Sequence, residues 1–198
     1  MTGEPLARGL GRGSTYGPGA ILTPANAVTL LRIAFAPVAF VMMLEAPDQS
    51  SWPLLVVWFL LSTSDLLDGT LARRYGSTRS GAFLDPLADK LLAIGGIGIM
   101  CWEGRFSWIP FGLIVIREVV ISLFRARYVR RGLAVPASRL AKYKTLLQLG
   151  AVGWITLPPT NDIEWLATTT LWLGVIAGLV SGGQYLVAGG RAATTMGR

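Results

Sequence analysis

The sequence contains no histidine and only one cysteine, Cys101. Without histidine the protein has no imidazole general base, no His metal ligand and no Ser-His-Asp triad. A single thiol excludes an intrachain disulfide and a zinc site built from cysteines. Any acid–base or metal chemistry must therefore use carboxylates, lysine, tyrosine or hydroxyl groups.

Charged residues are also scarce. They make up 15% of the 198 residues, whereas hydrophobic residues make up 52%. This charged share is well below that of soluble proteins. A soluble helical bundle would need a polar face along each helix, and residues 52–63 and 91–101 offer almost none. The composition therefore predicts a membrane protein.

The apolar runs predict six helices, each near the roughly 20 residues that span a bilayer. The expected helices cover residues 26–44, 52–74, 82–101, 107–130, 139–157 and 163–187. We therefore expect an all-α, polytopic membrane protein with a six-helix transmembrane domain over residues 21–190. Residues 1–20 are glycine-rich and polar, which predicts a flexible cytoplasmic tail rather than a signal peptide. Residues 191–198 are expected to form a second cytoplasmic tail.

The net charge of +7 is distributed unevenly between the predicted loops. If the N-terminus lies in the cytoplasm, the cytoplasmic segments hold nearly all loop arginines and lysines. The opposite loops hold Arg105 and several acidic residues. This asymmetry follows the positive-inside rule and predicts a cell-membrane protein with both termini in the cytoplasm. It also argues against a nucleic-acid partner, because the basic residues follow loop sidedness instead of forming one soluble face.

Four aspartates interrupt the apolar pattern between the second and third predicted helices. Asp65 and Asp68 are three residues apart, and Asp85 and Asp89 are four apart. Each spacing places a pair on one helix face. Carboxylates beside membrane-length helices are costly and usually functional. Because the turn between the two helices is predicted to be cytoplasmic, we expect the cluster at the cytoplasmic rim of the bilayer.

Carboxylate oxygens at such spacing suit Mg²⁺ or Mn²⁺. Two such ions can clamp the attacking and leaving oxygens of a phosphoryl transfer. Gly69, Ala72 and Gly81 leave space for a phosphate or base, and Arg73 supplies a bidentate phosphate donor. Two other interpretations remain open at this point, a structural salt-bridge cluster and a cation-transport path. Transport is better served by charges at mid-membrane.

The pattern of aspartates and small residues resembles the signature of the CDP-alcohol phosphotransferases. The residues that carry the resemblance are Asp65, Asp68, Gly69, Ala72, Arg73, Gly81, Asp85 and Asp89. The turn between Arg73 and Gly81 is one residue shorter than in many members. The resemblance implies a six-helix membrane fold, commonly homodimeric, that displaces CMP from a CDP-linked lipid or CDP-alcohol with a second alcohol.

The same resemblance implies a role for each signature residue. The four aspartates, Asp65, Asp68, Asp85 and Asp89, would hold two metal ions, and Asp89 would also act as the general base. The CDP moiety would be received by Gly69, Ala72, Arg73 and Gly81.

The opening of the first predicted helix adds further polar residues. Asn26 and Thr29 are candidates for the CDP-lipid site, although such residues near Pro24 also cap helices. Arg32 lies about two turns into an apolar helix and needs a partner such as an acidic residue or a lipid headgroup.

A second set of basic residues is a candidate site for an acceptor phosphate. Cations beside a metal site suit a phosphorylated acceptor better than a free alcohol. Arg117 also has Glu118 beside it as a local partner, and the charges near Arg125 also suit a helix anchor. The candidates are Arg117, Arg125, Arg139, Lys142 and Lys144.

Four strings resemble the phosphatidylglycerophosphate synthase branch of the family. They are the opening Pro-x-Asn-x-x-Thr-x-x-Arg, Leu-Asp-Pro-Leu-Ala-Asp-Lys-Leu at 84–91, Ile-Arg-Glu-Val at 116–119, and Ala-Ser-Arg-Leu-Ala-Lys-Tyr-Lys-Thr at 137–145. This branch implies CDP-diacylglycerol and sn-glycerol 3-phosphate as substrates. Alternatives with the same chemistry use inositol phosphate or phosphatidylglycerol as acceptor. A different class of alternative is a membrane cation-binding or transport protein.

Overall fold

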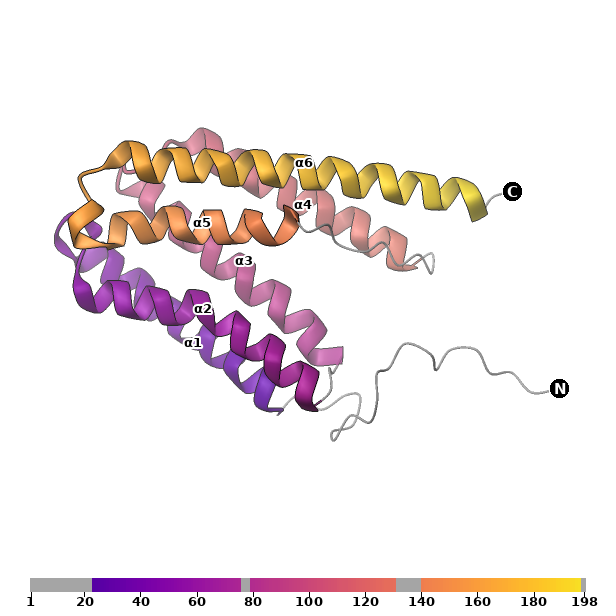
Figure 1. The fold of residues 1–198 in the computed structure, drawn as a ribbon, viewed down its shortest axis with the longest axis horizontal. Coiled ribbons are helices and arrows are strands. Elements are labelled where there is room, and N and C mark those ends of the chain that lie inside the picture. The colour runs from indigo at the N-terminus through magenta and orange to yellow at the C-terminus, as the bar shows by residue number, and fades with distance from the viewer. Residues whose placement is uncertain (1–22, 76–78, 131–139, 197–198) are drawn as a thin grey trace. The chain divides into compact units, whose positions relative to one another are not determined.

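The protein is described by a computed structural model that covers residues 23–75, 79–130 and 140–196. Within these residues the chain is helical and contains no strand, which confirms the all-α prediction (Figure 1). The α-helices are α1 (Pro24–Glu45), α2 (Trp52–Tyr75), α3 (Arg79–Trp102), α4 (Trp108–Arg130), α5 (Leu140–Thr156) and α6 (Glu164–Met196). Two short 3-10 turns, η1 (Pro47–Gln49) and η2 (Pro158–Thr160), precede α2 and α6.

The helix ends follow the predicted apolar runs closely, with one exception at the C-terminus. There α6 was expected to end near residue 187 but continues to Met196. The segment 191–196, expected as part of a tail, is therefore helical. The extension contains no proline, and its alanines favour the helix.

The structure divides into two compact units. Unit 1 consists of Met1–Ala39 and Val56–Leu92, and unit 2 consists of Phe40–Leu55 and Ala93–Arg198. The described part of unit 1 therefore contains most of α1, most of α2 and the first part of α3. These are the segments that carry the four aspartates. Unit 2 contains α4, α5 and α6, which carry the basic candidates Arg117, Arg125, Lys142 and Lys144.

In unit 2, α6 packs against both α5 and α4, and Figure 1 shows α5 and α6 running side by side. Glycines on α6 allow the close approach to α5. A Cβ at Gly174 would lie 3.2 Å from Gln148 Cγ, and one at Gly178 would lie 3.3 Å from Lys144 Cδ. The small residues of α6 thus bring it against the polar face of α5.

A second close approach joins the C-terminal part of α4 to α6. Tyr128 is buried against Tyr185, with ring centroids 6.0 Å apart, and Ile121 completes this cluster. A Cβ at Gly189 would lie 2.2 Å from the Tyr128 ring. The Tyr128 ring therefore occupies the space that a side chain at Gly189 would need.

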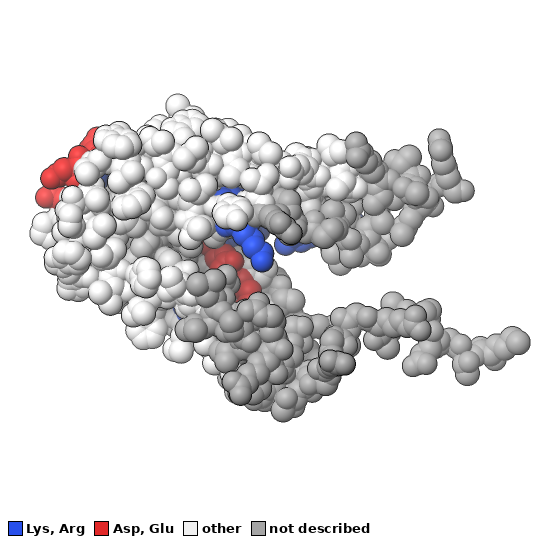
Figure 2. Space-filling model, in the orientation of Figure 1, with Lys and Arg blue, Asp and Glu red and all other residues white. Residues whose placement is uncertain are grey.

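The described surface is largely apolar. Among the described residues, two helical segments, Asn26–Glu45 and Glu164–Gly190, are long and apolar enough to cross a membrane, with mean hydropathies of 2.1 and 1.5. On the face shown in Figure 2, most described residues are neither acidic nor basic. Large side chains such as Phe59, Ile109 and Leu146 are more than 60% exposed. Apolar exposure on this scale is typical of a membrane protein.

Candidate active site

The first turn of α1 orients the polar residues of unit 1. Thr23 caps the helix, because its Oγ1 accepts a hydrogen bond from the Asn26 backbone N at 3.2 Å. Pro24 takes the first helical position, where its missing N–H costs nothing. Capping therefore falls to Thr23, while Asn26 and Thr29, one turn apart, are buried within the unit.

Thr29 binds one of the predicted metal ligands. Its Oγ1 donates a hydrogen bond to Asp85 Oδ1 at 2.8 Å. Thr29 is fully buried and Asp85 is half-buried. The hydroxyl group thus fixes one oxygen of a carboxylate on a different helix.

Arg32 binds the second aspartate of α3. Its Nη1 donates to Asp89 Oδ1 at 2.8 Å, and its Nε donates to Ser64 Oγ at 2.8 Å. The Arg32 side chain is 1% exposed, and that of Asp89 is 37% exposed. The expectation that Arg32 needs a partner is confirmed, and the partner is an acidic residue.

The three signature residues of α3 follow one another at intervals of four. Gly81 is buried, and Asp85 and Asp89 follow on successive turns of the same face. Each carboxylate accepts a hydrogen bond from α1 on its Oδ1. The start of α3 therefore presents two fixed, half-buried carboxylates, which are oxygen donors of the kind that Mg²⁺ and Mn²⁺ prefer.

The remaining signature residues lie on α2. Asp65, Asp68, Gly69, Ala72 and Arg73 belong to its helical backbone, but their side chains lie outside the described part of the structure. Asp65 and Asp68 lie three positions apart in α2, and their shared face stays a prediction from helical geometry. The meeting of all four carboxylates stays a prediction. Among the described residues, no group of three or more acidic or cysteine side chains forms a metal cluster.

A buried ion network occupies unit 2. Glu118 Oε1 accepts from Arg117 Nη1 at 2.6 Å and also from Lys144 Nζ. Arg117 further donates from Nε to the Gly178 carbonyl and from Nη2 to Ser181 Oγ, both at 3.1 Å. The side chains of all three charged residues are only 11% exposed. The network therefore ties α4 to α5 and α6.

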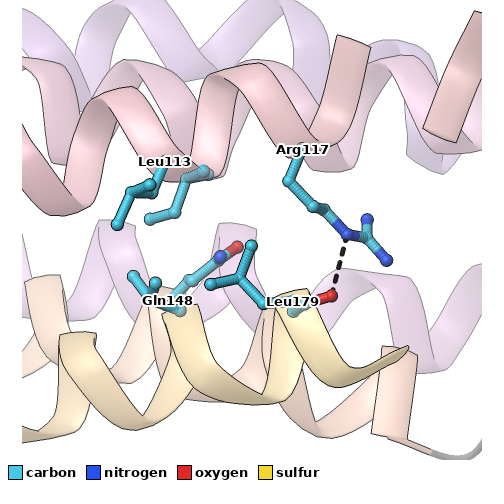
Figure 3. Close-up of a pocket in the computed structure, with 7 residues that line it drawn as sticks. Leu113, Arg117, Gln148 and Leu179 are labelled. Carbon is cyan, nitrogen blue, oxygen red and sulfur yellow. Dashed lines mark hydrogen bonds between the residues drawn. The ribbon is translucent and has the colours of Figure 1, made fainter. Parts of the chain in front are cut away.

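Beside the network, α4, α5 and α6 line a small pocket of about 10 Å³, which is room for about one water molecule. Figure 3 shows Leu113 and Arg117 facing Gln148 and Leu179 across it. Gln148 is 3% exposed and follows Lys144 by one turn of α5. Sequence reasoning missed both Gln148 and the pairing of Glu118 with Lys144. The only signal for Gln148 was its spacing of four from Lys144.

The five candidates for the acceptor phosphate differ in their surroundings. Arg117 and Lys144 belong to the buried network. Arg125 and Lys142 are exposed, and the Arg125 guanidinium lies 5.8 Å from the centre of the Tyr185 ring. Arg139 lies outside the described residues. Of the described candidates, Arg117 and Lys144 therefore share one buried carboxylate, whereas Arg125 and Lys142 are exposed.

Residues 22–180 match the family model of the CDP-alcohol phosphatidyltransferases. The chain belongs to this family. The match spans both the aspartates and the basic residues, so it confirms the resemblance that the signature indicated. Members of this family generally use divalent metal ions.

Curated relatives point to one branch of the family. A probable phosphatidylglycerophosphate synthase of Mycobacterium tuberculosis (strain CDC 1551 / Oshkosh) is 32% identical over 178 residues, covering 88% of this chain and 85% of the relative. A CDP-diacylglycerol--glycerol-3-phosphate 3-phosphatidyltransferase of Escherichia coli (strain K12) is 32% identical over 168 residues, covering 81% and 91%. An enzyme of the same name from Shigella flexneri serotype 5b has the same identity and coverage.

Proposed function

We propose that the protein transfers the phosphatidyl group of CDP-diacylglycerol to sn-glycerol 3-phosphate, which gives phosphatidylglycerophosphate and CMP. The observation that carries this proposal is the 32% identity, over more than four-fifths of the chain, to relatives named for this reaction. The hydrogen-bonded carboxylates of α3 give the proposal a chemical basis.

In this proposal Asp65, Asp68, Asp85 and Asp89 hold two Mg²⁺ or Mn²⁺ ions. The described donors fit such ions, because Asp85 and Asp89 are carboxylates on adjacent turns of one helix face and each is oriented from α1. When bound, the ions would neutralise charge on the pyrophosphate. Thr29 serves this site by donating to Asp85.

The proposed reaction needs one proton acceptor and one leaving group. Asp89 takes the proton from the acceptor hydroxyl group, whose oxygen then attacks the phosphorus attached to diacylglycerol. The bond from that phosphorus to the bridging oxygen of CMP breaks, and CMP leaves with the electron pair. Positioning and electrostatic stabilisation supply most of the acceleration in such a transfer.

The CDP part of the donor is proposed to lie against six residues of unit 1. Small residues leave room for the nucleotide, and Arg73 pairs with a phosphate oxygen. The proposed set is Asn26, Thr29, Gly69, Ala72, Arg73 and Gly81.

The phosphate of the acceptor is proposed to bind the basic residues of unit 2 and the segment before α5. Arg125 and Lys142 are exposed, so they can pair with a phosphate without breaking the network of Glu118. Arg117 and Lys144 share one carboxylate, so their cluster retains one net positive charge. This charge would attract the phosphate electrostatically. Arg139 completes the proposed set.

We further propose that the six α-helices span the cell membrane, with both termini and the aspartates on the cytoplasmic side, and that two copies form a homodimer. The loop asymmetry of arginine and lysine supports this orientation. The diacylglycerol chains of the donor would then stay in the bilayer while CMP leaves into the cytoplasm.

A comparison of acceptors tests the proposed function. Purified protein is given CDP-diacylglycerol and Mg²⁺, and CMP release is measured with glycerol 3-phosphate, inositol phosphate, phosphatidylglycerol, serine and inositol. We expect the highest kcat/KM with glycerol 3-phosphate. A preference for inositol phosphate or phosphatidylglycerol would support those alternative acceptors, and metal flux without CMP release would support a transporter.

A further inference from the structure

Arg32 has no part in the proposed reaction, yet it occupies a costly position. It lies about two turns into the apolar helix α1, and only 2% of the residue is exposed. A buried guanidinium group is strongly destabilising unless its donors are satisfied. The hydrogen-bond partners of Arg32 therefore indicate its role.

Its two partners lie beside the first of the four aspartates and at the last of them in the sequence. Arg32 Nε binds Ser64, the residue directly before Asp65 on α2, and Nη1 binds Asp89 on α3. Ser64 Oγ in turn donates to the Leu61 carbonyl at 2.8 Å, which fixes its rotamer. One planar group thus connects the turn before the first aspartate to the carboxylate of the last.

We propose that Arg32 is a positioning residue that holds the Asp89 carboxylate at a fixed place relative to the Asp65 turn of α2. This inference rests on the function proposed above. A guanidinium group suits the task, because its nitrogens form a rigid fork with fixed angles. Lysine carries the same charge on a single nitrogen and cannot reproduce the two-armed geometry.

The first test is Arg32→Lys. A displacement of about 1 Å at a reacting group can lower a rate by about 100-fold. We expect kcat per folded molecule to fall by about 10-fold or more. The KM values for CDP-diacylglycerol and glycerol 3-phosphate should stay within about threefold, because Arg32 contacts neither substrate in this proposal. A kcat equal to that of the unmodified protein, or a rise in KM alone, would overturn it.

The second test removes one arm of the fork and does not depend on whether Arg32→Lys folds. Ser64→Ala deletes the partner of Nε, and we expect kcat to fall about two- to fivefold. The double variant Arg32→Lys/Ser64→Ala should be no slower than Arg32→Lys alone, because both changes break the same bond. Independent, multiplying effects on kcat would contradict a shared role.

Thr63→Ala is the matched control. Thr63 is the neighbour of Ser64, and its hydroxyl group donates to the Phe59 carbonyl of its own helix, at 2.7 Å. We expect an unchanged kcat. If Thr63→Ala lowers kcat as much as Ser64→Ala does, the effect comes from loss of a helix-bound hydroxyl and the positioning role is wrong.

Binding of Mn²⁺, followed by electron paramagnetic resonance, gives a readout that needs no turnover. Because Asp89 is a proposed metal ligand, we expect Arg32→Lys to weaken Mn²⁺ binding several-fold and Thr63→Ala to leave it unchanged. Equal Mn²⁺ affinity in Arg32→Lys would overturn the positioning role. An unmodified protein that binds Mn²⁺ but releases no CMP with any acceptor would instead contradict the proposed function.

Discussion

At the residue scale, the assignment of Asp89 as general base gives the sharpest prediction. Replacing it with asparagine keeps the size of the side chain but removes the proton acceptor. We expect Asp89→Asn to lower CMP release by at least about 100-fold, while CDP-diacylglycerol binding, measured by calorimetry, stays largely intact. The matched control is Asp162→Asn, at an exposed aspartate just before α6, which should turn over normally. Normal turnover in Asp89→Asn would refute the assignment.

A second prediction for a single residue concerns the contribution of Glu118 to the free energy of unfolding. Its carboxylate pairs with both Arg117 and Lys144, so Glu118→Gln leaves two buried cations without their carboxylate. We expect the free energy of unfolding to fall by about 3 kcal/mol or more, measured by denaturation in mixed micelles. Adding Lys144→Met should restore part of the loss, because it removes one unpaired cation. The exposed Glu164→Gln control should change stability by no more than about 1 kcal/mol, and equal losses in the two single variants would contradict the network.

At the element scale, the contact of α4 with α6 depends on Gly189. A Cβ there would lie 2.2 Å from the Tyr128 ring, so Gly189→Ala forces the ring or the helix to move. We expect a loss of about 1–3 kcal/mol in the free energy of unfolding. Gly183→Ala is the control, since nothing lies within 4 Å of its Cβ position and alanine favours the helix. A Gly189→Ala variant that is as stable as Gly183→Ala would show that this contact is absent in the membrane.

The elements also show how far the sequence alone could be interpreted. The helices follow from their apolar runs, and the spacing of Asp85 and Asp89 fixes a shared face because both lie on one helix. The partners of Arg32 and Glu118 come from other helices, and spacing along one helix does not encode such pairings. The end of α6 was misplaced because the apolar pattern weakens before the helix stops. The side-chain arrangement of Asp65 and Asp68 stays a prediction.

At the scale of the whole molecule, the proposed orientation in the membrane can be tested with cysteine labelling. Cys101 is buried, and in a Cys101→Ser background single cysteines can replace the exposed Arg127 and Asp162. We expect a membrane-impermeant maleimide to label the cysteine at 162 from outside intact cells. The cysteine at 127 should react only after the membrane is opened. Labelling of both from outside would contradict the proposed topology.

The most direct test of the central claim is the stoichiometry of products. Protein in vesicles that contain CDP-diacylglycerol is supplied with Mg²⁺ and glycerol 3-phosphate, and both products are quantified by mass spectrometry. The proposed reaction predicts one phosphatidylglycerophosphate formed for each CMP released, with neither product when glycerol 3-phosphate is left out. CMP released without phosphatidylglycerophosphate, or no CMP at all, would contradict it.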